Sequence, residues 1–134
     1  MPRLYREAPV NSIWEGSGNV ICLDVLRTLG RVPAALPALL AELDAAGGAS
    51  ASLDIAIALL RKELADTGGL ELRARSVVEL MALTWQGALL TQHAPAAIAD
   101  AFCASRLGPR WTGTYGTLPA GIDFDAIIDR AASG

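Results

Sequence analysis

One short stretch near the amino terminus brings acidic, aromatic, hydroxyl and glycine side chains together at a spacing that suits chemistry. Residues 13–19 read Ile-Trp-Glu-Gly-Ser-Gly-Asn, so Glu15 lies between the apolar ring of Trp14 and a turn of small residues. An apolar neighbour raises the proton affinity of a carboxylate, and such a carboxylate can serve as a general base near neutral pH. We therefore single out Glu15 as a candidate catalytic base.

Two other interpretations of this stretch remain open on the residues alone. Glu15 immediately precedes a helical pattern, and a carboxylate at that position stabilises the positive end of the helix dipole without any catalytic role. The turn of Gly16, Ser17 and Gly18 could bind a phosphate group through backbone N–H groups, although a single turn of small residues is a weak signal. All three interpretations place the stretch at the start of a helix.

The rest of the chain predicts helices. Alanine and leucine dominate while aromatic and β-branched residues are scarce, which favours helix over sheet. Apolar residues recur at steps of three and four, and glycine or proline residues interrupt the pattern. The segment 70–93 is apolar nearly all round beyond Ser76, so we expect it at the centre of the fold or in an interface. The expected helices cover residues 17–30, 33–46, 50–67, 70–93, 96–106 and a short span after Asp123.

These elements predict one all-α domain of 134 residues, because the chain is long enough for only one core. We expect a bundle of about five to six helices at residues 17–134, with an irregular stretch at 108–122. Residues 1–16 contain two prolines and no helical period, which predicts an extended or briefly helical entry segment that lies on a larger surface. Three aromatic residues either anchor the fold or stack on bases: Trp85, Trp111 and Tyr115.

The charge balance does not produce a broad positive field. Eleven Lys and Arg residues against fourteen Asp and Glu residues give a formal net charge of −3, whereas nucleic acids and anionic membranes attract basic surfaces. A local basic patch is compatible with this balance, and its candidates are Arg61, Lys62, Arg73 and Arg75. Acidic residues are interleaved with them, so a solvated face of mixed charge is the alternative.

Metal, disulfide and membrane roles are not expected. Cys22 and Cys103 are isolated in apolar stretches, which predicts two buried free thiols in a reducing cytoplasm. His93 is the single histidine and ends an apolar helix, where it can satisfy terminal carbonyl groups, so we expect no metal site. There is no signal-peptide pattern and no apolar run of about 18 residues, so we expect a soluble cytoplasmic protein.

The amino-terminal stretch also resembles the signature of a known family. Residues 5–8 read Tyr-Arg-Glu-Ala and residues 13–17 read Ile-Trp-Glu-Gly-Ser. This pattern is similar to Tyr-Arg-Asp-Ala followed by Ile-Tyr-Glu-Gly-Thr near the carboxyl end of acyl-CoA dehydrogenases. The fuller run from Leu4 to Asn19, continuing through residues 22–27, resembles the AidB-like branch, which comprises alkylation-response and isovaleryl-CoA dehydrogenase-like proteins. The resemblance implies that the chain is the carboxyl-terminal helical region of such a protein.

The resemblance also implies roles for individual residues. Glu15 would be the base that removes the proton α to the thioester carbonyl of an acyl-CoA, while FAD takes the β-hydride. Trp14 and Gly16 would contact the substrate, and Trp14 departs from the usual tyrosine, which changes the volume and polarity of the acyl pocket. FAD contacts would come from the next three residues, Ser17, Gly18 and Asn19.

A larger parent protein follows from the same resemblance. Its amino-terminal helical domain and β-barrel would hold the flavin ring, so the 134 residues alone are expected to be inactive. The full-length parent would use an acyl-CoA substrate and an electron acceptor and would form homo-oligomers. The AidB-like branch is associated with DNA binding through this region, so the alternative is a DNA-binding or oligomerisation module with a vestigial dehydrogenase site. The candidate DNA-binding residues are Arg61, Lys62, Arg73 and Arg75.

Overall fold

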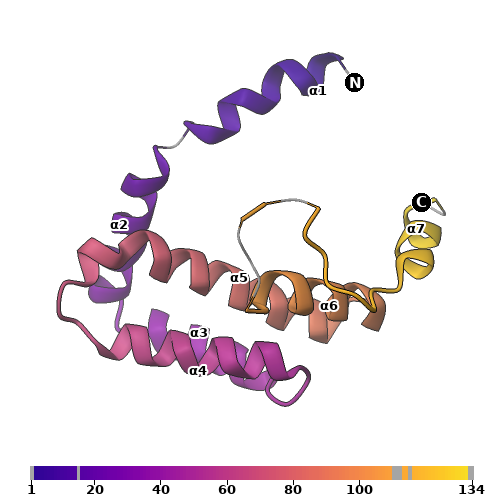
Figure 1. Cartoon of the computed structure of the whole chain (residues 1–134). Coiled ribbons are helices and arrows are strands. Elements are labelled where there is room, and N and C mark those ends of the chain that lie inside the picture. The colour runs from indigo at the N-terminus through magenta and orange to yellow at the C-terminus, as the bar shows by residue number, and fades with distance from the viewer. Residues whose placement is uncertain (1, 15, 110–112, 115, 133–134) are drawn as a thin grey trace.

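The computed structural model describes residues 2–14, 16–109, 113–114 and 116–132. Glu15, Trp111 and Tyr115 lie outside the described residues, so the roles expected for them stay predictions. The described chain has seven α-helices and no strand, which confirms the all-α class (Figure 1). The α-helices are α1 (Pro2–Glu7), α2 (Gly18–Arg31), α3 (Ala35–Ala45), α4 (Ala51–Ala65), α5 (Ala74–His93), α6 (Ala96–Phe102) and α7 (Phe124–Ala132). Three shorter turns are η1 (Ala8–Ser12), η2 (Leu70–Arg73) and the π-helical η3 (Cys103–Leu107).

Helix α5 is the centre of the bundle. It packs against α2, α3, α4, α6 and η3, as its nearly continuous apolar surface predicts. The core combines residues from α3, α4, α5 and η3, and these elements lie side by side (Figure 1). The core residues are Leu39, Leu43, Ala46, Leu53, Ile57, Leu60, Val77, Ala88 and Cys103.

Polar residues occupy the position before three of the helices. Ser17 and Ser50 occupy the N-cap positions of α2 and α4 with extended backbone angles, although neither side chain makes a capping hydrogen bond. The side chain of Asp123 does cap α7, because its Oδ1 accepts a hydrogen bond of 3.0 Å from the amide of Ala126. Gly69 adopts a left-handed conformation (φ +63°) between α4 and α5, which a residue with a Cβ adopts at a cost.

The start of α3 differs from the expectation. The expected range of 33–46 puts Pro33 in the first turn of this helix, whereas α3 begins at Ala35. Pro37 therefore lies within the first turn, where backbone N–H groups have no partner inside the helix. The missing N–H of Pro37 costs little there, and Pro33 belongs to the preceding turn.

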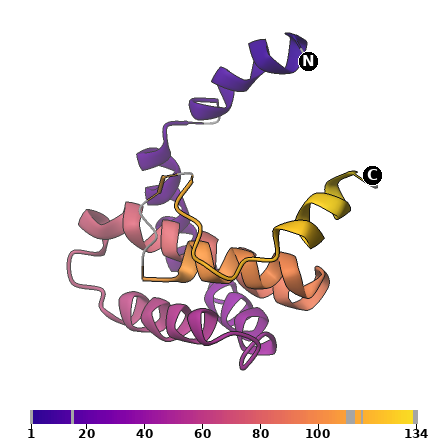
Figure 2. The ribbon, with the colours of Figure 1, turned by 45° about the vertical axis from the view of Figure 1, so that its right-hand side comes forward.

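The entry segment is helical, which is one of the two forms expected for it. Residues 2–12 form α1 and η1, and the absence of a hydrophobic period shows only that no face of them is buried. Local interactions support these turns: Arg3 Nε donates to Glu7 Oε1 at 3.0 Å, and Ser12 Oγ donates to the carbonyl of Pro9 at 2.9 Å. The described residues of 2–14 are all exposed, and they project away from the bundle (Figures 1 and 2).

The described residues between 108 and 122 form no helix or strand, in agreement with the irregular stretch expected there. They lead to α7, which contacts α6 and keeps Phe124 and Ile128 exposed. No helix in the described part of the chain has both the length and the apolar character needed to span a membrane.

A glycine of α5 permits a close approach of apolar side chains, and this generates a prediction. A Cβ at Gly87 of α5 would lie 2.9 Å from Leu107 Cδ1 and 3.4 Å from Leu53 Cδ1. Gly87→Val should therefore lower the free energy of unfolding by about 1–3 kcal/mol through overpacking, as measured by urea denaturation. Gly30→Val is the matched control, because no heavy atom lies within 4 Å of a Cβ at that helical glycine. Equal losses in the two variants would contradict the packing argument.

Candidate functional site

The stretch singled out by its chemistry lies at the junction between the entry segment and α2. Gly16 has a positive φ of +116°, a conformation that glycine adopts readily, and Ser17 then occupies the N-cap of α2. Trp14 is 58% exposed. The structure thus displays the residues flanking Glu15 on the surface, at the amino end of a 14-residue helix.

The first turn of α2 is suited to an anion. The helical hydrogen bonds begin with the amide of Ile21, which donates to the carbonyl of Ser17 at 3.0 Å. The amides of Gly18, Asn19 and Val20 precede that bond, and such N–H groups together with the helix dipole favour negative charge. The amino end of α2 can therefore accept a phosphate oxygen.

Arg75 adds a positive side chain to the same turn. Its Nη1 donates to Asn19 Oδ1 at a long distance of 3.4 Å, and a Cβ on Gly18 would lie only 2.0 Å from Nη1. The glycine thus lets the guanidinium group lie directly against the helix. Arg75 and Asn19 also line a small cavity of about 260 Å³. Sequence reasoning placed Arg75 in a basic patch and missed this neighbour, because 56 positions separate the two residues.

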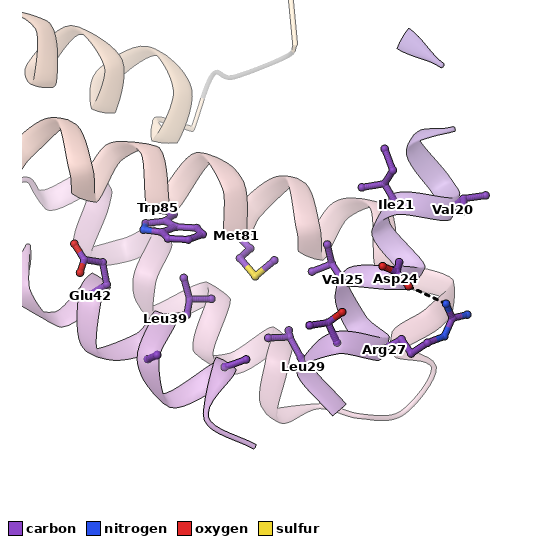
Figure 3. A pocket seen from close by; sticks show the side chains of 13 residues that line it. Val20, Ile21, Asp24, Val25, Arg27, Leu29, Leu39, Glu42, Met81 and Trp85 are labelled. Atoms are coloured by element: carbon purple, nitrogen blue, oxygen red, sulfur yellow. Dashed lines mark hydrogen bonds and ion pairs between the residues drawn. The ribbon is translucent and has the colours of Figure 1, made fainter. Parts of the chain in front are cut away.

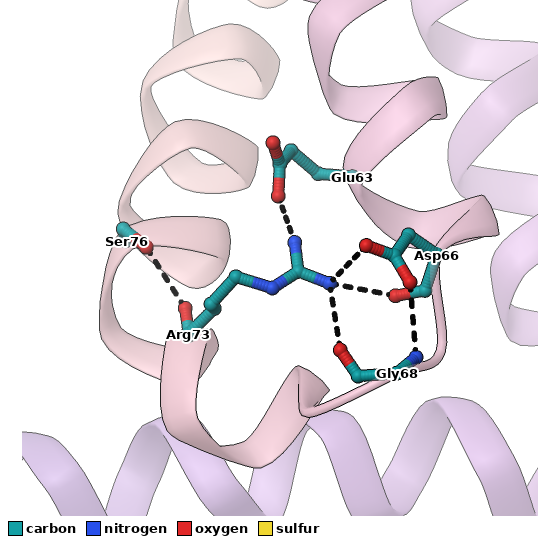
Figure 4. A network of polar contacts seen from close by, with 5 residues as sticks. All are labelled: Glu63, Asp66, Gly68, Arg73 and Ser76. Carbon is teal, nitrogen blue, oxygen red and sulfur yellow. Dashed lines mark hydrogen bonds and ion pairs between the residues drawn. The ribbon is translucent and has the colours of Figure 1, made fainter.

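Arg73 is engaged in the turn between α4 and α5 (Figure 4). Its Nη1 pairs with Glu63, while Nη2 lies 3.2 Å from Asp66 Oδ2 and donates to the Asp66 carbonyl at 2.7 Å. Nη2 also lies 3.4 Å from the carbonyl of Gly68. The side chain is 30% exposed, so these bonds are partly shielded from water. Arg73 therefore joins the end of α4 to the start of α5.

The remaining basic candidates do not gather with Arg73. Arg61 Nη2 lies 2.5 Å from Asp44 Oδ1 of α3, and Lys62 is exposed in the last turn of α4. Arg61, Arg73 and Arg75 are thus directed toward α3, the end of α4 and the start of α2. The structure does not bring them together as one patch, and DNA binding stays a prediction.

A larger groove lies between α2, α3 and α5 (Figure 3). Its volume is about 770 Å³, and its walls are mostly aliphatic and aromatic. Val20 and Ile21 form one end, and Trp85 and Glu42 form the other. The groove begins within one turn of Asn19, so the exposed motif and this apolar surface share α2.

The cysteines and the histidine occupy structural positions. Cys22 and Cys103 are buried free thiols, as expected, and burial raises the pKa of the Cys103 thiol. His93 ends α5, in agreement with the expected terminal role. Among the described residues no three His, Cys, Asp or Glu side chains are grouped to hold a metal ion.

The Arg73 contacts predict a role in stability. Removing the guanidinium group leaves Glu63 and two carbonyl groups without their charged donor, so Arg73→Ala should lower the free energy of unfolding by about 1–2 kcal/mol. Arg75→Ala is the control, because its side chain is exposed and its bond is long, and we expect a change within about 0.5 kcal/mol. Urea denaturation of both variants measures the difference. An Arg73→Ala protein as stable as the parent chain would refute this role.

Comparison with known proteins relates the chain to one curated sequence. It is 37% identical over 110 residues to the Escherichia coli (strain K12) protein named Putative acyl-CoA dehydrogenase AidB. The match covers 82% of this chain but 20% of the relative, so the chain spans about a fifth of the length of the curated relative it matches. No family model and no solved structure matches the chain. The match supports a resemblance to part of an acyl-CoA dehydrogenase-type protein.

Proposed function

We propose that the chain is the carboxyl-terminal region of an FAD-dependent acyl-CoA dehydrogenase, whose full-length form introduces an α,β double bond into an acyl-CoA thioester. The observation that carries this proposal is the similarity to a protein named as such an enzyme, combined with the sequence motif Trp-Glu-Gly-Ser, of which Trp14 and Ser17 are exposed beside the amino end of α2. The motif lies where other parts of a longer protein can reach it.

The residues at the start of α2 fit a phosphate of FAD. Amides that precede the first helical bond, the Ser17 hydroxyl and the Arg75 guanidinium group are all donors, and they surround a glycine that leaves room for close approach. Ser17, Gly18 and Asn19 would therefore hold the phosphate or adenosine part of the cofactor, with Arg75 beside them. When bound, FAD supplies the hydride acceptor for the β-carbon.

The chain's own contribution to the reaction is proton removal. In this proposal the Glu15 carboxylate takes the proton from the α-carbon of the thioester, and the Trp14 ring excludes water from that carboxylate. Gly16 leaves space for the acyl chain because it carries no side chain. The flavin ring and the rest of the acyl-CoA would be held by other parts of the parent, so the 134 residues alone should not turn over substrate.

The first test addresses the base. In the full-length parent, Glu15→Gln should abolish reduction of the flavin by acyl-CoA, because the amide cannot accept the α-proton, while the protein retains FAD. Stopped-flow absorbance of the flavin measures both. Glu7→Gln is the control, since Glu7 is an exposed carboxylate of the same segment that is paired with Arg3, and it should reduce normally. Flavin reduction at the parental rate in Glu15→Gln would sink the catalytic assignment.

The second test addresses the cofactor contact. Arg75→Ala in the full-length parent should weaken FAD binding about tenfold to a hundredfold, which corresponds to loss of one charge-assisted contact to phosphate. Fluorescence titration of the apoprotein with FAD gives the affinity. Arg61→Ala removes a comparable guanidinium group that pairs with Asp44 instead, and it should bind FAD as the parent does. Equal affinities for Arg75→Ala and Arg61→Ala would remove Arg75 from the cofactor site.

A further inference from the structure

Arg75 is the cation beside the motif, and its own contacts hold it weakly. Its side chain is exposed, and the hydrogen bond from Nη1 to Asn19 Oδ1 is 3.4 Å long. An exposed arginine has many rotamers open to it, and a bond of this length selects among them weakly. The position of the guanidinium group against Gly18 therefore depends on the backbone that carries it, at the start of α5.

Arg73 anchors that backbone two residues earlier. Its Nη1 pairs with Glu63 of α4, and its Nη2 donates to the carbonyl of Asp66 at 2.7 Å and lies 3.2 Å from Asp66 Oδ2 (Figure 4). The planar fork of a guanidinium group makes several such bonds at once in one orientation. The side chain is 30% exposed and thus partly shielded from water, so these bonds hold Arg73 more firmly than the contact with Asn19 holds Arg75.

The groups on either side of Arg73 are themselves fixed. Asp66 Oδ1 accepts a hydrogen bond of 3.0 Å from the amide of Gly68, whose carbonyl lies 3.4 Å from Arg73 Nη2. The hydroxyl of Ser76 donates to the carbonyl of Arg73 at 3.0 Å (Figure 4). The side chain of Arg73 is therefore tied to the end of α4, and its carbonyl is tied to the first turn of α5. Arg75 lies within the segment that the Ser76 bond closes.

Helix geometry converts this anchor into a direction for Arg75. Successive helical residues are rotated by about 100°, so side chains two positions apart lie about 200° apart around the axis. Arg73 and Arg75 thus point to nearly opposite sides, one toward the end of α4 and the other toward α2. Ala74 between them is 4% exposed, so packing also restrains the start of α5. With Arg73 fixed on one side, the guanidinium group of Arg75 is directed at Gly18 and Asn19 on the other.

We propose that Arg73 is a positioning residue for the candidate cofactor site: held by Glu63 and Asp66, it fixes the start of α5 so that Arg75 faces the phosphate of FAD at the amino end of α2. This inference rests on the proposed function, in which Arg75 contacts that phosphate. The contacts of Arg73 are with the end of α4 and not with the motif, so it acts through Arg75. A turn outside the motif thereby contributes to the affinity for the cofactor.

Fluorescence titration of the full-length apoprotein with FAD tests the positioning. Arg73→Ala should weaken FAD binding about threefold to tenfold, because Arg75 then faces the phosphate in a smaller fraction of the molecules. In an Arg75→Ala background the same change should have no further effect on the affinity, since the residue through which it acts is gone. Arg61→Ala is the matched control, because it removes an ion pair between α4 and Asp44 of α3 and should leave FAD affinity at the parental value.

Variants of Glu63 test the same anchor while both arginines stay in place, and they decide the question if Arg73→Ala does not fold. Glu63→Gln keeps an oxygen that can accept the bond from Arg73 Nη1, so its FAD affinity should stay within about twofold of the parental value. Glu63→Leu removes the acceptor and should weaken FAD binding about threefold or more. Equal affinities in the two Glu63 variants would contradict the positioning.

The outcomes separate the positioning from the proposed function. Parental FAD affinity in Arg73→Ala, together with weaker binding in Arg75→Ala, would overturn the positioning and leave the cofactor contact in place. An Arg73→Ala effect of the same size in both backgrounds would also overturn it, because Arg73 would then act on the whole fold and not through Arg75. Parental affinity in Arg75→Ala would remove the cofactor contact itself, and the positioning would fail with it.

Discussion

The bundle depends on the close packing of α5, which contacts α2, α3, α4, α6 and η3. Gly87 and Ala88 lie at a tight contact of α5, because a Cβ at Gly87 would meet the side chains of Leu107 and Leu53. The absent side chain lets η3 and α4 approach the backbone of α5 directly. One turn earlier Thr84 is fully buried, and its hydroxyl has no partner in the described structure. Tight packing has taken precedence there over a hydrogen bond.

The polar network of Arg73 extends this packing to the candidate site. Arg73 joins η2 to the end of α4, and the backbone then turns directly into α5. Arg75 follows two residues later, in the first turn of α5, where its side chain reaches Gly18 and Asn19 of α2. The position of a guanidinium group beside the motif is therefore set by a turn that lies outside the motif. Arg73 and Arg75 make different contacts because side chains two positions apart point in different directions.

The sequence predicts the positions of the helices well, but it predicts few of the contacts between them. Glycine pairs at 47–48 and 68–69 and Pro95 are local signals that mark the breaks between helices, and the apolar character of residues 70–93 predicts the central place of α5. The sequence leaves the entry segment open between an extended and a briefly helical form, because helix prediction relies on a buried face and none of residues 2–14 is buried. The Arg75–Asn19 contact and the groove between α2, α3 and α5 could not be predicted, since each joins positions far apart whose relative rotation is fixed only by packing.

Helix α2 carries the motif at its amino end and also lines the apolar groove. Its amino end displays the motif, and its first two turns form one end of the apolar groove. Residues 2–14 connect to the same helix through Gly16, so any protein surface that covers these residues also lies close to the motif. The motif and the apolar groove are therefore connected through one helix, because the motif lies at the amino end of α2 and the groove begins in its first turn.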